Sequence, residues 1–147
     1  MKTYSVPNPE TWTTMASALL DSLPNGGVFG LRGDLGAGKT TFVRAIVEEI
    51  CRRMNRPAMR VTSPTFVFRQ PYPELKPSVD HFDLYRLENI DEPTLRELGV
   101  LEAIELARES NGFVFIEWPE KIKPGVLTLD GTWSIEIDGA GRKFRLA

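Results

Sequence analysis

The stretch Gly33-Asp34-Leu35-Gly36-Ala37-Gly38-Lys39-Thr40 decides the expected fold of this chain. It follows the pattern of a glycine, four residues and then Gly-Lys-Thr, which is typical of a P-loop between a strand and a helix. The apolar run at residues 28–31 predicts the strand before the loop, and apolar residues at helical spacing over 42–51 predict the helix after it. The sequence therefore indicates a phosphate-binding loop at a strand-to-helix junction.

The residue types in this loop suit the binding of a nucleoside triphosphate. Phosphate oxygens need several backbone N–H groups at one point, and glycines at 33, 36 and 38 permit the unusual backbone angles and the close approach. The N-terminus of the following helix adds roughly half a positive charge at the same place. We expect Lys39 to reach the β- and γ-phosphates and the Thr40 hydroxyl to bind Mg²⁺. A chance glycine-rich turn is the alternative.

A nucleoside triphosphatase also needs acidic side chains that hold the metal and orient the attacking water. Glu117 follows the apolar run at 113–116, and Asp83 ends the strand expected at 79–83. Strands of this kind deliver the residues at their ends to the sheet edge where α/β proteins bind ligands. We therefore expect both carboxylates at the site, and a surface acid at a strand end is the plainer interpretation of each.

Three further features have both a functional and a structural interpretation. The hydroxyl-rich turn at 62–66 is either a nucleotide-sensing loop or a plain connection between strands. His81 is a candidate general base, but no paired nucleophile is evident, so a structural histidine with satisfied hydrogen bonds is favoured. A cluster of arginines after the second helix could meet RNA or an acidic partner, although basic groups near a helix C-terminus also suit its dipole. The cluster consists of Arg52, Arg53, Arg56 and Arg60.

The remaining chain alternates expected helices and strands. Capping residues and helical spacing predict helices at 8–23, 92–98 and 100–107. Apolar runs predict strands at 61–62, 66–68, 79–83 and 113–116, with a surface loop at 71–77 and a hairpin on the sheet edge from 133–137 and 142–146. The run at 113–116 is apolar on both faces and belongs inside the sheet. The expected fold is a single α/β domain over 1–147, a P-loop NTPase three-layer sandwich with a mostly parallel sheet, antiparallel strands and a C-terminal hairpin. The order of the strands stays open.

Composition limits the compartment and the partners. The chain has 147 residues, of which 41% are hydrophobic and 26% charged, as in one ordinary globular domain. Its 18 basic and 20 acidic residues give a net charge of −2, so bulk electrostatics do not favour RNA or anionic lipid. One cysteine and one histidine exclude an internal disulfide and a zinc site of usual composition, which fits the reducing cytoplasm. No window approaches the ~18 apolar residues that span a bilayer, so we expect a soluble, cytoplasmic protein without membrane contact.

Four sequence blocks resemble the bacterial TsaE (YjeE) family, which consists of small P-loop ATPases required for threonylcarbamoyladenosine (t6A) modification of tRNA. Their order and spacing extend over positions 7–146, and the last two blocks are far more discriminating than the P-loop alone. The blocks are Gly33-Asp34-Leu35-Gly36-Ala37-Gly38-Lys39-Thr40-Thr41-Phe42, Ser63-Pro64-Thr65-Phe66, His81-Phe82-Asp83-Leu84-Tyr85-Arg86-Leu87 and Glu117-Trp118-Pro119-Glu120.

The resemblance implies a site, a cofactor and partners. It assigns ATP contacts to Gly36, Ala37, Gly38, Lys39, Thr40, Thr41 and Arg142, metal contacts to Thr40, Asp83 and Glu117, and catalytic roles to Lys39, Asp83 and Glu117. Residues 63–66 and 81–86 would form two switch-like segments. The implied function is a Mg²⁺-dependent ATPase, slow without partners, that binds the TsaB–TsaD complex and resets it between rounds. Contact with tRNA would come only through that complex.

Two other functions stay open. A small-molecule P-loop kinase would use the same loop to transfer phosphate to a hydroxyl, although the chain lacks an arginine-rich lid insertion. A nucleotide-gated binding module would turn over too slowly by itself to count as an enzyme. GTP is disfavoured as the nucleotide because no Asn-Lys-x-Asp segment occurs.

Overall fold

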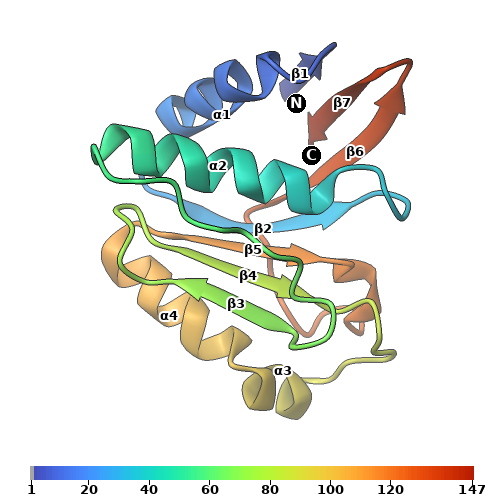
Figure 1. The fold of residues 1–147 in the computed structure, drawn as a ribbon. Helices are drawn as coiled ribbons and strands as arrows, with labels where there is room; N and C mark the ends of the chain where they lie inside the picture. Colours follow the sequence, from blue (N-terminus) through green and yellow to red (C-terminus); the bar gives the residue numbers. More distant parts are fainter. Residues whose placement is uncertain (1) are drawn as a thin grey trace.

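The computed structural model describes residues 2–147, which form one seven-stranded sheet with helices on both faces (Figure 1). The strands are β1 (Lys2–Val6), β2 (Gly27–Arg32), β3 (Arg69–Tyr72), β4 (Val79–Asp83), β5 (Phe113–Glu117), β6 (Gly131–Asp138) and β7 (Gly141–Leu146). The helices are α1 (Thr11–Ser22), α2 (Lys39–Arg53), α3 (Glu92–Leu98) and α4 (Val100–Ser110), with a short 3-10 helix, η1 (Pro119–Lys121). Among these described residues, no helix has both the length and the apolar character needed to cross a membrane.

The sheet has the strand order β1-β7-β6-β2-β5-β4-β3. Its centre is parallel, because β2 pairs in parallel with β5 and β6, and β4 pairs in parallel with β5. The flanking pairs are antiparallel: β3 with β4, β6 with β7, and β7 with β1. The expected α/β sheet with antiparallel additions is confirmed, and so is the interior position of β5, whose five residues are all buried.

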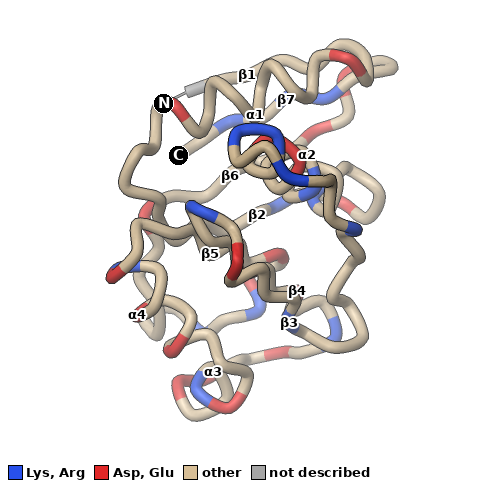
Figure 2. Tube along the Cα trace, turned by 60° about the vertical axis from the view of Figure 1, so that its left-hand side comes forward, with Lys and Arg blue, Asp and Glu red and all other residues tan. Residues whose placement is uncertain are grey.

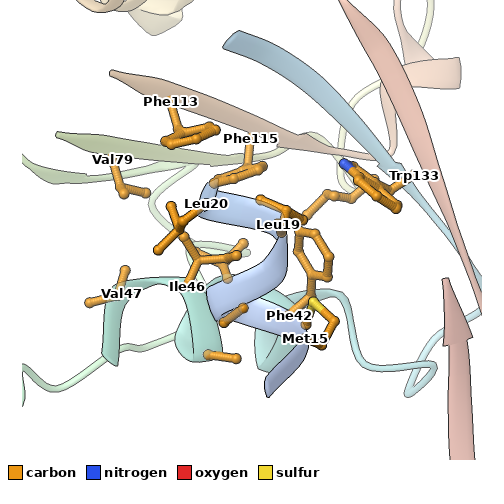
Figure 3. Close-up of a cluster of buried hydrophobic side chains, with 14 of the residues drawn as sticks. Met15, Leu19, Leu20, Phe42, Ile46, Val47, Val79, Phe113, Phe115 and Trp133 are labelled. Atoms are coloured by element: carbon orange, nitrogen blue, oxygen red, sulfur yellow. The ribbon is translucent and has the colours of Figure 1, made fainter. Parts of the chain in front are cut away.

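An apolar core lies on each face of the sheet, between the sheet and the helices that cover it. Helices α1 and α2 cover one face of the sheet, where Leu19 and Phe42 pack with Phe115 and Trp133 (Figure 3). Helices α3 and α4 cover the other face over β2, β4 and β5. Side chains alternate along β5, so that Phe113 and Phe115 enter the first core and Val114 and Ile116 enter the second, which explains why this strand is apolar on both faces. The three-layer arrangement is therefore the one expected.

The register of the central strands aligns their carboxyl ends at one edge of the sheet. Glu117, the last residue of β5, lies between Leu31 of β2 and Asp83 of β4. The loop at 33–38 leaves β2 at this same end of the sheet and enters α2. The carboxyl ends of three parallel strands therefore meet beside the P-loop, where α/β folds bind ligands.

The expected strands at 61–62 and 66–68 are wrong, and β3 lies further along the chain. Residues 61–68 form loop and turns, in which the N–H groups of Val67 and Phe68 both donate to the carbonyl of Pro64. Phe68 has a φ of 67°, which a strand does not allow. The strand instead starts at Arg69 and includes Pro71, in the stretch expected to be a surface loop. An edge strand tolerates proline because the missing N–H faces away from its partner.

The C-terminal hairpin is confirmed, but its place at the sheet edge is wrong. β7 pairs with β6 on one side and with β1 on the other, so β1 is the edge strand. β1 has only five residues, of which Tyr4 packs against the core and Val6 is buried in it. So short an alternation at the start of a chain is a weak signal for a strand.

Charged residues of both signs are interspersed along the described chain, as the small net charge suggests (Figure 2). The arginines at the end of α2 are largely used within the fold. Arg52 and Arg53 both donate to the buried carboxylate of Glu49, and Arg53 also pairs with Asp21 of α1 at 2.9 Å. These ion pairs and the helix terminus account for Arg52 and Arg53 without an RNA partner.

Candidate nucleotide-binding site

The P-loop adopts backbone angles that depend on its glycines. Gly36 and Gly38 have positive φ values of 79° and 114°, which L side chains rarely adopt. Gly33 has an ordinary φ, but a Cβ there would lie 2.7 Å from the carbonyl oxygen of Ile135. Gly38 precedes α2, and its carbonyl accepts from the N–H of Phe42 at 2.8 Å. The loop therefore leads directly into the N-terminus of α2, as a phosphate site requires.

Lys39 is folded back into this loop. Its Nζ donates to the carbonyl oxygens of Gly33 at 2.5 Å and Asp34 at 3.0 Å, and lies 4.2 Å from the ring centroid of Trp118. Burial lowers the pKa of the Lys39 ammonium, while the nearby carboxylates of Glu117 and Asp83 oppose that effect. A buried cation bound mainly to neutral carbonyls is well placed to exchange these contacts for an anionic oxygen.

The two acids lie at the ends of neighbouring strands and are both buried. The Thr40 hydroxyl donates to Oε2 of Glu117 at 3.1 Å. Asp83 accepts from the Thr65 hydroxyl at 2.6 Å and from the backbone N–H of Tyr85 at 2.9 Å. Residues that are far apart in the sequence therefore meet at one point beside the P-loop.

These oxygen donors fit a magnesium ion that arrives with a nucleotide. Thr40 supplies a hydroxyl, and Glu117 and Asp83 supply carboxylates, which are the hard ligands that Mg²⁺ prefers. Within residues 2–147, no group of three or more His, Cys, Asp or Glu side chains forms a metal centre made by the protein alone. Mg²⁺ in phosphate sites usually keeps waters and takes one or two carboxylates plus phosphate oxygens, so this small donor set is sufficient.

His81 is partnered on one side of its ring. The side chain is fully buried, and Nε2 lies 2.5 Å from Oε2 of Glu117, while Nδ1 has no partner. The expectation of a histidine with satisfied hydrogen bonds is therefore only half correct. Its position on β4, two residues before Asp83, directs it to the carboxylate of the adjacent strand. His81 orients Glu117 and does not itself line the pocket.

A pocket of about 310 Å³ opens over these groups. It is lined by Leu35, Gly36, Gly38, Lys39, Thr40, Thr41, Ser63, Thr65, Asp83, Tyr85, Glu117 and Trp118. Most of the site residues expected from the sequence therefore lie around one cavity. Ala37 and Arg142 lie behind the loop, where Nε of Arg142 donates to the carbonyl of Ala37 at 2.7 Å. Arg142 thus contacts the P-loop backbone from the C-terminal hairpin.

Trp118 and Tyr85 line the pocket, although the sequence assigned neither a role of its own. Trp118 has a φ of 62°, an uncommon angle for a bulky residue, and turns the chain from β5 into η1. Its ring lies 5.0 Å from that of Tyr85 and under the Lys39 ammonium. Both aromatics stand in the blocks that carry the family resemblance, and that was the available signal.

The fold and the loop together define a P-loop protein of the nucleotide-binding class. Residues 6–145 match the family described as "Threonylcarbamoyl adenosine biosynthesis protein TsaE". The chain therefore belongs to the TsaE family.

Relatives with that name support the assignment. The tRNA threonylcarbamoyladenosine biosynthesis protein TsaE of Aquifex aeolicus is 32% identical over 147 residues, covering 99% of this chain and 96% of that protein. The protein of the same name from Rickettsia felis is 37% identical over 116 residues, covering 79% of this chain and 61% of that protein. The chain thus spans about three fifths of the length of the Rickettsia felis relative and nearly all of the Aquifex one.

A solved structure supports the fold. The crystal structure of Bacillus subtilis YdiB superposes with a TM-score of 0.63 at 22% sequence identity, covering 99% of this chain and 83% of that one.

Proposed function

We propose that this chain is a Mg²⁺-dependent ATPase of the cytoplasm that supports t6A modification of tRNA by binding and resetting the TsaB–TsaD complex. The proposal rests on membership of the TsaE family and on the names of its relatives. The observation that carries it furthest is the contact between the Thr40 hydroxyl and the Glu117 carboxylate, at 3.1 Å. A P-loop hydroxyl beside a buried strand-end acid is the arrangement needed by a metal-assisted phosphoryl transfer.

In this proposal the P-loop binds the phosphates. The backbone N–H groups of residues 36–41, at the N-terminus of α2, donate to the phosphate oxygens of the nucleotide. Lys39 exchanges its hydrogen bonds to the carbonyls of Gly33 and Asp34 for contacts with the β- and γ-phosphates. Arg142 holds the loop through the carbonyl of Ala37. Gly36 and Gly38 keep the cradle open because they add no side chain to it.

Glu117 and Asp83 act beside the γ-phosphate. A bound Mg²⁺ ion would supply charge neutralisation between the phosphates. Thr40 and the two carboxylates would hold that ion, directly or through water, and Glu117 would also orient the attacking water. His81 keeps Oε2 of Glu117 in place from the buried side, at 2.5 Å. Two ordered donors on one carboxylate fix its direction, which is the pre-organisation that catalysis requires.

Slow turnover in the isolated chain follows from the pocket lining. Among the described residues that line the pocket, none is an arginine. Arg142 is already engaged with the carbonyl of Ala37. An arginine that stabilises the transition state is commonly worth a factor of about 10³–10⁵ in rate. A partner that completes the site would therefore control hydrolysis, and ATP turnover would release that partner for the next round.

The metal part of the proposal is tested by ATP binding with and without Mg²⁺ in the parent and in Thr40→Ala. Because the hydroxyl is proposed as a metal ligand, Thr40→Ala should lower the affinity for ATP with Mg²⁺ more than the affinity for ATP alone. Thr41→Ala, next in the chain, is the matched control for loss of a threonine. Equal losses with and without Mg²⁺ in Thr40→Ala would contradict the metal role.

The pathway part is tested by reconstituted t6A formation on tRNA. With TsaB and TsaD present, adding this chain and ATP should convert a single round of modification into repeated rounds. Phosphate appearing on a small-molecule hydroxyl, with no effect on t6A formation, would favour the kinase function instead.

A further inference from the structure

A second, larger cavity lies at the end of the sheet opposite to the nucleotide pocket, and we call it the amino-end cavity. It has a volume of about 1120 Å³ and is lined by Val79 and Phe113, the first residues of β4 and β5. The same strands end at Asp83 and Glu117, which line the nucleotide pocket (Figure 1). The two cavities are therefore separated by the length of these strands, and the proposed function uses none of the residues that line the second one.

The walls of the amino-end cavity are mostly apolar. Leu20 and Ile50 come from α1 and α2 on one face of the sheet, and Leu106 comes from α4 on the other. Leu75 adds the loop between β3 and β4. Leu106 is 53% exposed, so part of this apolar surface is open to solvent. Small-molecule sites are clefts of about 300–1,000 Å³ with mainly apolar walls and a few placed polar groups. This cavity has the size and the lining of such a site.

Two ion pairs neutralise most of the charged side chains that line the cavity. Nη2 of Arg53 lies 2.9 Å from Oδ1 of Asp21, and Nη2 of Arg69 lies 2.7 Å from Oδ2 of Asp80. Arg69 also donates to Oδ1 of Asp80 through Nε, so this pair is bidentate. Such pairs are satisfied within the fold, and they leave the choice of ligand charge to the remaining groups.

The remaining charged groups place positive charge on the α2 side of the cavity. Lys76 and Glu109 line the cavity outside the two pairs. The backbone N–H of Lys76 donates to Sδ of Met54, which directly follows Arg53, whereas Glu109 belongs to α4 on the opposite face of the sheet. Among the described residues, the side-chain hydrogen bonds of Arg53 use Nε and Nη2, which leaves Nη1 available for another acceptor. An anionic group beside Lys76 would therefore meet cationic donors from two segments.

We infer that the amino-end cavity binds a small amphipathic anion, which is an apolar chain or ring system that ends in a carboxylate, sulfonate or phosphate. The apolar part packs against the walls around Leu106, and the anionic end pairs with Lys76 and Arg53. Because this cavity and the nucleotide pocket lie at opposite ends of β4 and β5, the ligand does not compete with a nucleotide. The inference goes beyond the proposed function and does not depend on it.

The test uses anilinonaphthalene sulfonate, a fluorescent probe that joins apolar rings to one anionic group. Titration of the folded parent should saturate at one probe per chain, and added ATP and Mg²⁺ should not displace the probe. Lys76→Gln should weaken probe binding by tenfold or more, and Leu106→Asn by threefold or more. Both side chains are exposed, so both variants should keep the thermal unfolding temperature of the parent.

Matched controls make the same changes outside the cavity. Lys123→Gln removes another exposed lysine, and Ile137→Asn replaces a side chain that is 61% exposed on β6. Neither residue lines the amino-end cavity, so probe affinity should stay within twofold in both variants.

Competition between two ligands of equal chain length tests the charge. Decanoate, below its micelle concentration, should displace the probe, and decyltrimethylammonium should not. No saturable binding to the parent, unchanged binding in both cavity variants, or equal displacement by the two chains would overturn the inference. Displacement of the probe by ATP would place it in the nucleotide pocket and would also overturn the inference.

Discussion

Glu117 is the residue on which most contacts of the site converge. It ends β5, accepts from the Thr40 hydroxyl and lies 2.5 Å from His81. We predict that Glu117→Gln keeps ATP affinity within a fewfold but loses most hydrolysis, because an amide keeps the shape and weakens water orientation and metal binding. The loss should therefore appear in kcat. Equilibrium binding and partner-stimulated phosphate release measure the two halves.

The comparison with Asp83 gives this prediction its control. Asp83→Asn removes the other strand-end charge and should affect metal affinity more strongly if Asp83 is the closer ligand. If Glu117→Gln hydrolyses ATP at the parent rate with partners present, Glu117 has a structural role. Asp83 must then be the acid that orients the attacking water.

Lys39 carries the second residue-scale prediction. Lys39→Ala should weaken ATP binding about tenfold or more, because a charge-assisted contact of roughly 1.5–3 kcal/mol is lost. The nucleotide-free protein should keep its thermal stability, since burial already disfavours the charged form of Lys39, and Ala removes that cost together with the hydrogen bonds to Gly33 and Asp34. An unchanged ATP affinity would remove the P-loop assignment, and unfolding of the variant would show that the lysine is structural.

At the scale of elements, Asp130 joins α4 to the central sheet and makes stability depend on pH. Its carboxylate accepts from Arg108 of α4 and from the N–H of Val28 in β2. The Arg108 hydrogen bond holds the pKa of Asp130 below its ordinary 3.8, against the opposing effect of burial. A lowered folded-state pKa means that this stabilisation is fully present above about pH 4 and is lost as the pH falls through the lowered value.

We therefore predict that Asp130→Asn destabilises the protein at pH 7 but progressively less below pH 4. The pair is half exposed, so the pH-dependent part should be about 0.2–1 kcal/mol. Urea unfolding of parent and variant at pH 7, 4 and 2.5 measures it. Glu92→Gln, which breaks the exposed pair with Arg96 inside α3, provides the comparison. A constant difference at every pH would mean that the charge of Asp130 is unimportant.

Elements with strong local signals were predictable, and those that depend on distant partners were not. The glycines of the P-loop, the helical spacing of apolar residues in α2 and the continuous apolar run of β5 are local signals, and each predicted its element. β3 was not predictable because Pro71 argues against a strand until its edge position is known. β1 was missed because the alternation in its five residues is a weak local signal, and they form a strand through pairing with β7.

For the molecule as a whole, the sequence predicted most of the residues that lie around the candidate site but not how they contact one another. Thr40, Asp83 and Glu117 were expected together from their positions at element ends. The pairing of His81 with Glu117 depends on the β4–β5 register, and the contact of Lys39 with Trp118 depends on a left-handed turn after β5. Neither register nor such a turn has a local sequence signal strong enough to predict it.

Phosphate release from ATP, measured for this chain alone and with TsaB and TsaD added, tests the central claim most directly. The account predicts slow, Mg²⁺-dependent hydrolysis by the isolated chain and a clear increase when the pair is added, because no arginine among the described residues lines the pocket. Glu117→Gln under the same conditions should abolish the increase. Fast hydrolysis by the isolated chain that is indifferent to TsaB and TsaD would contradict the account.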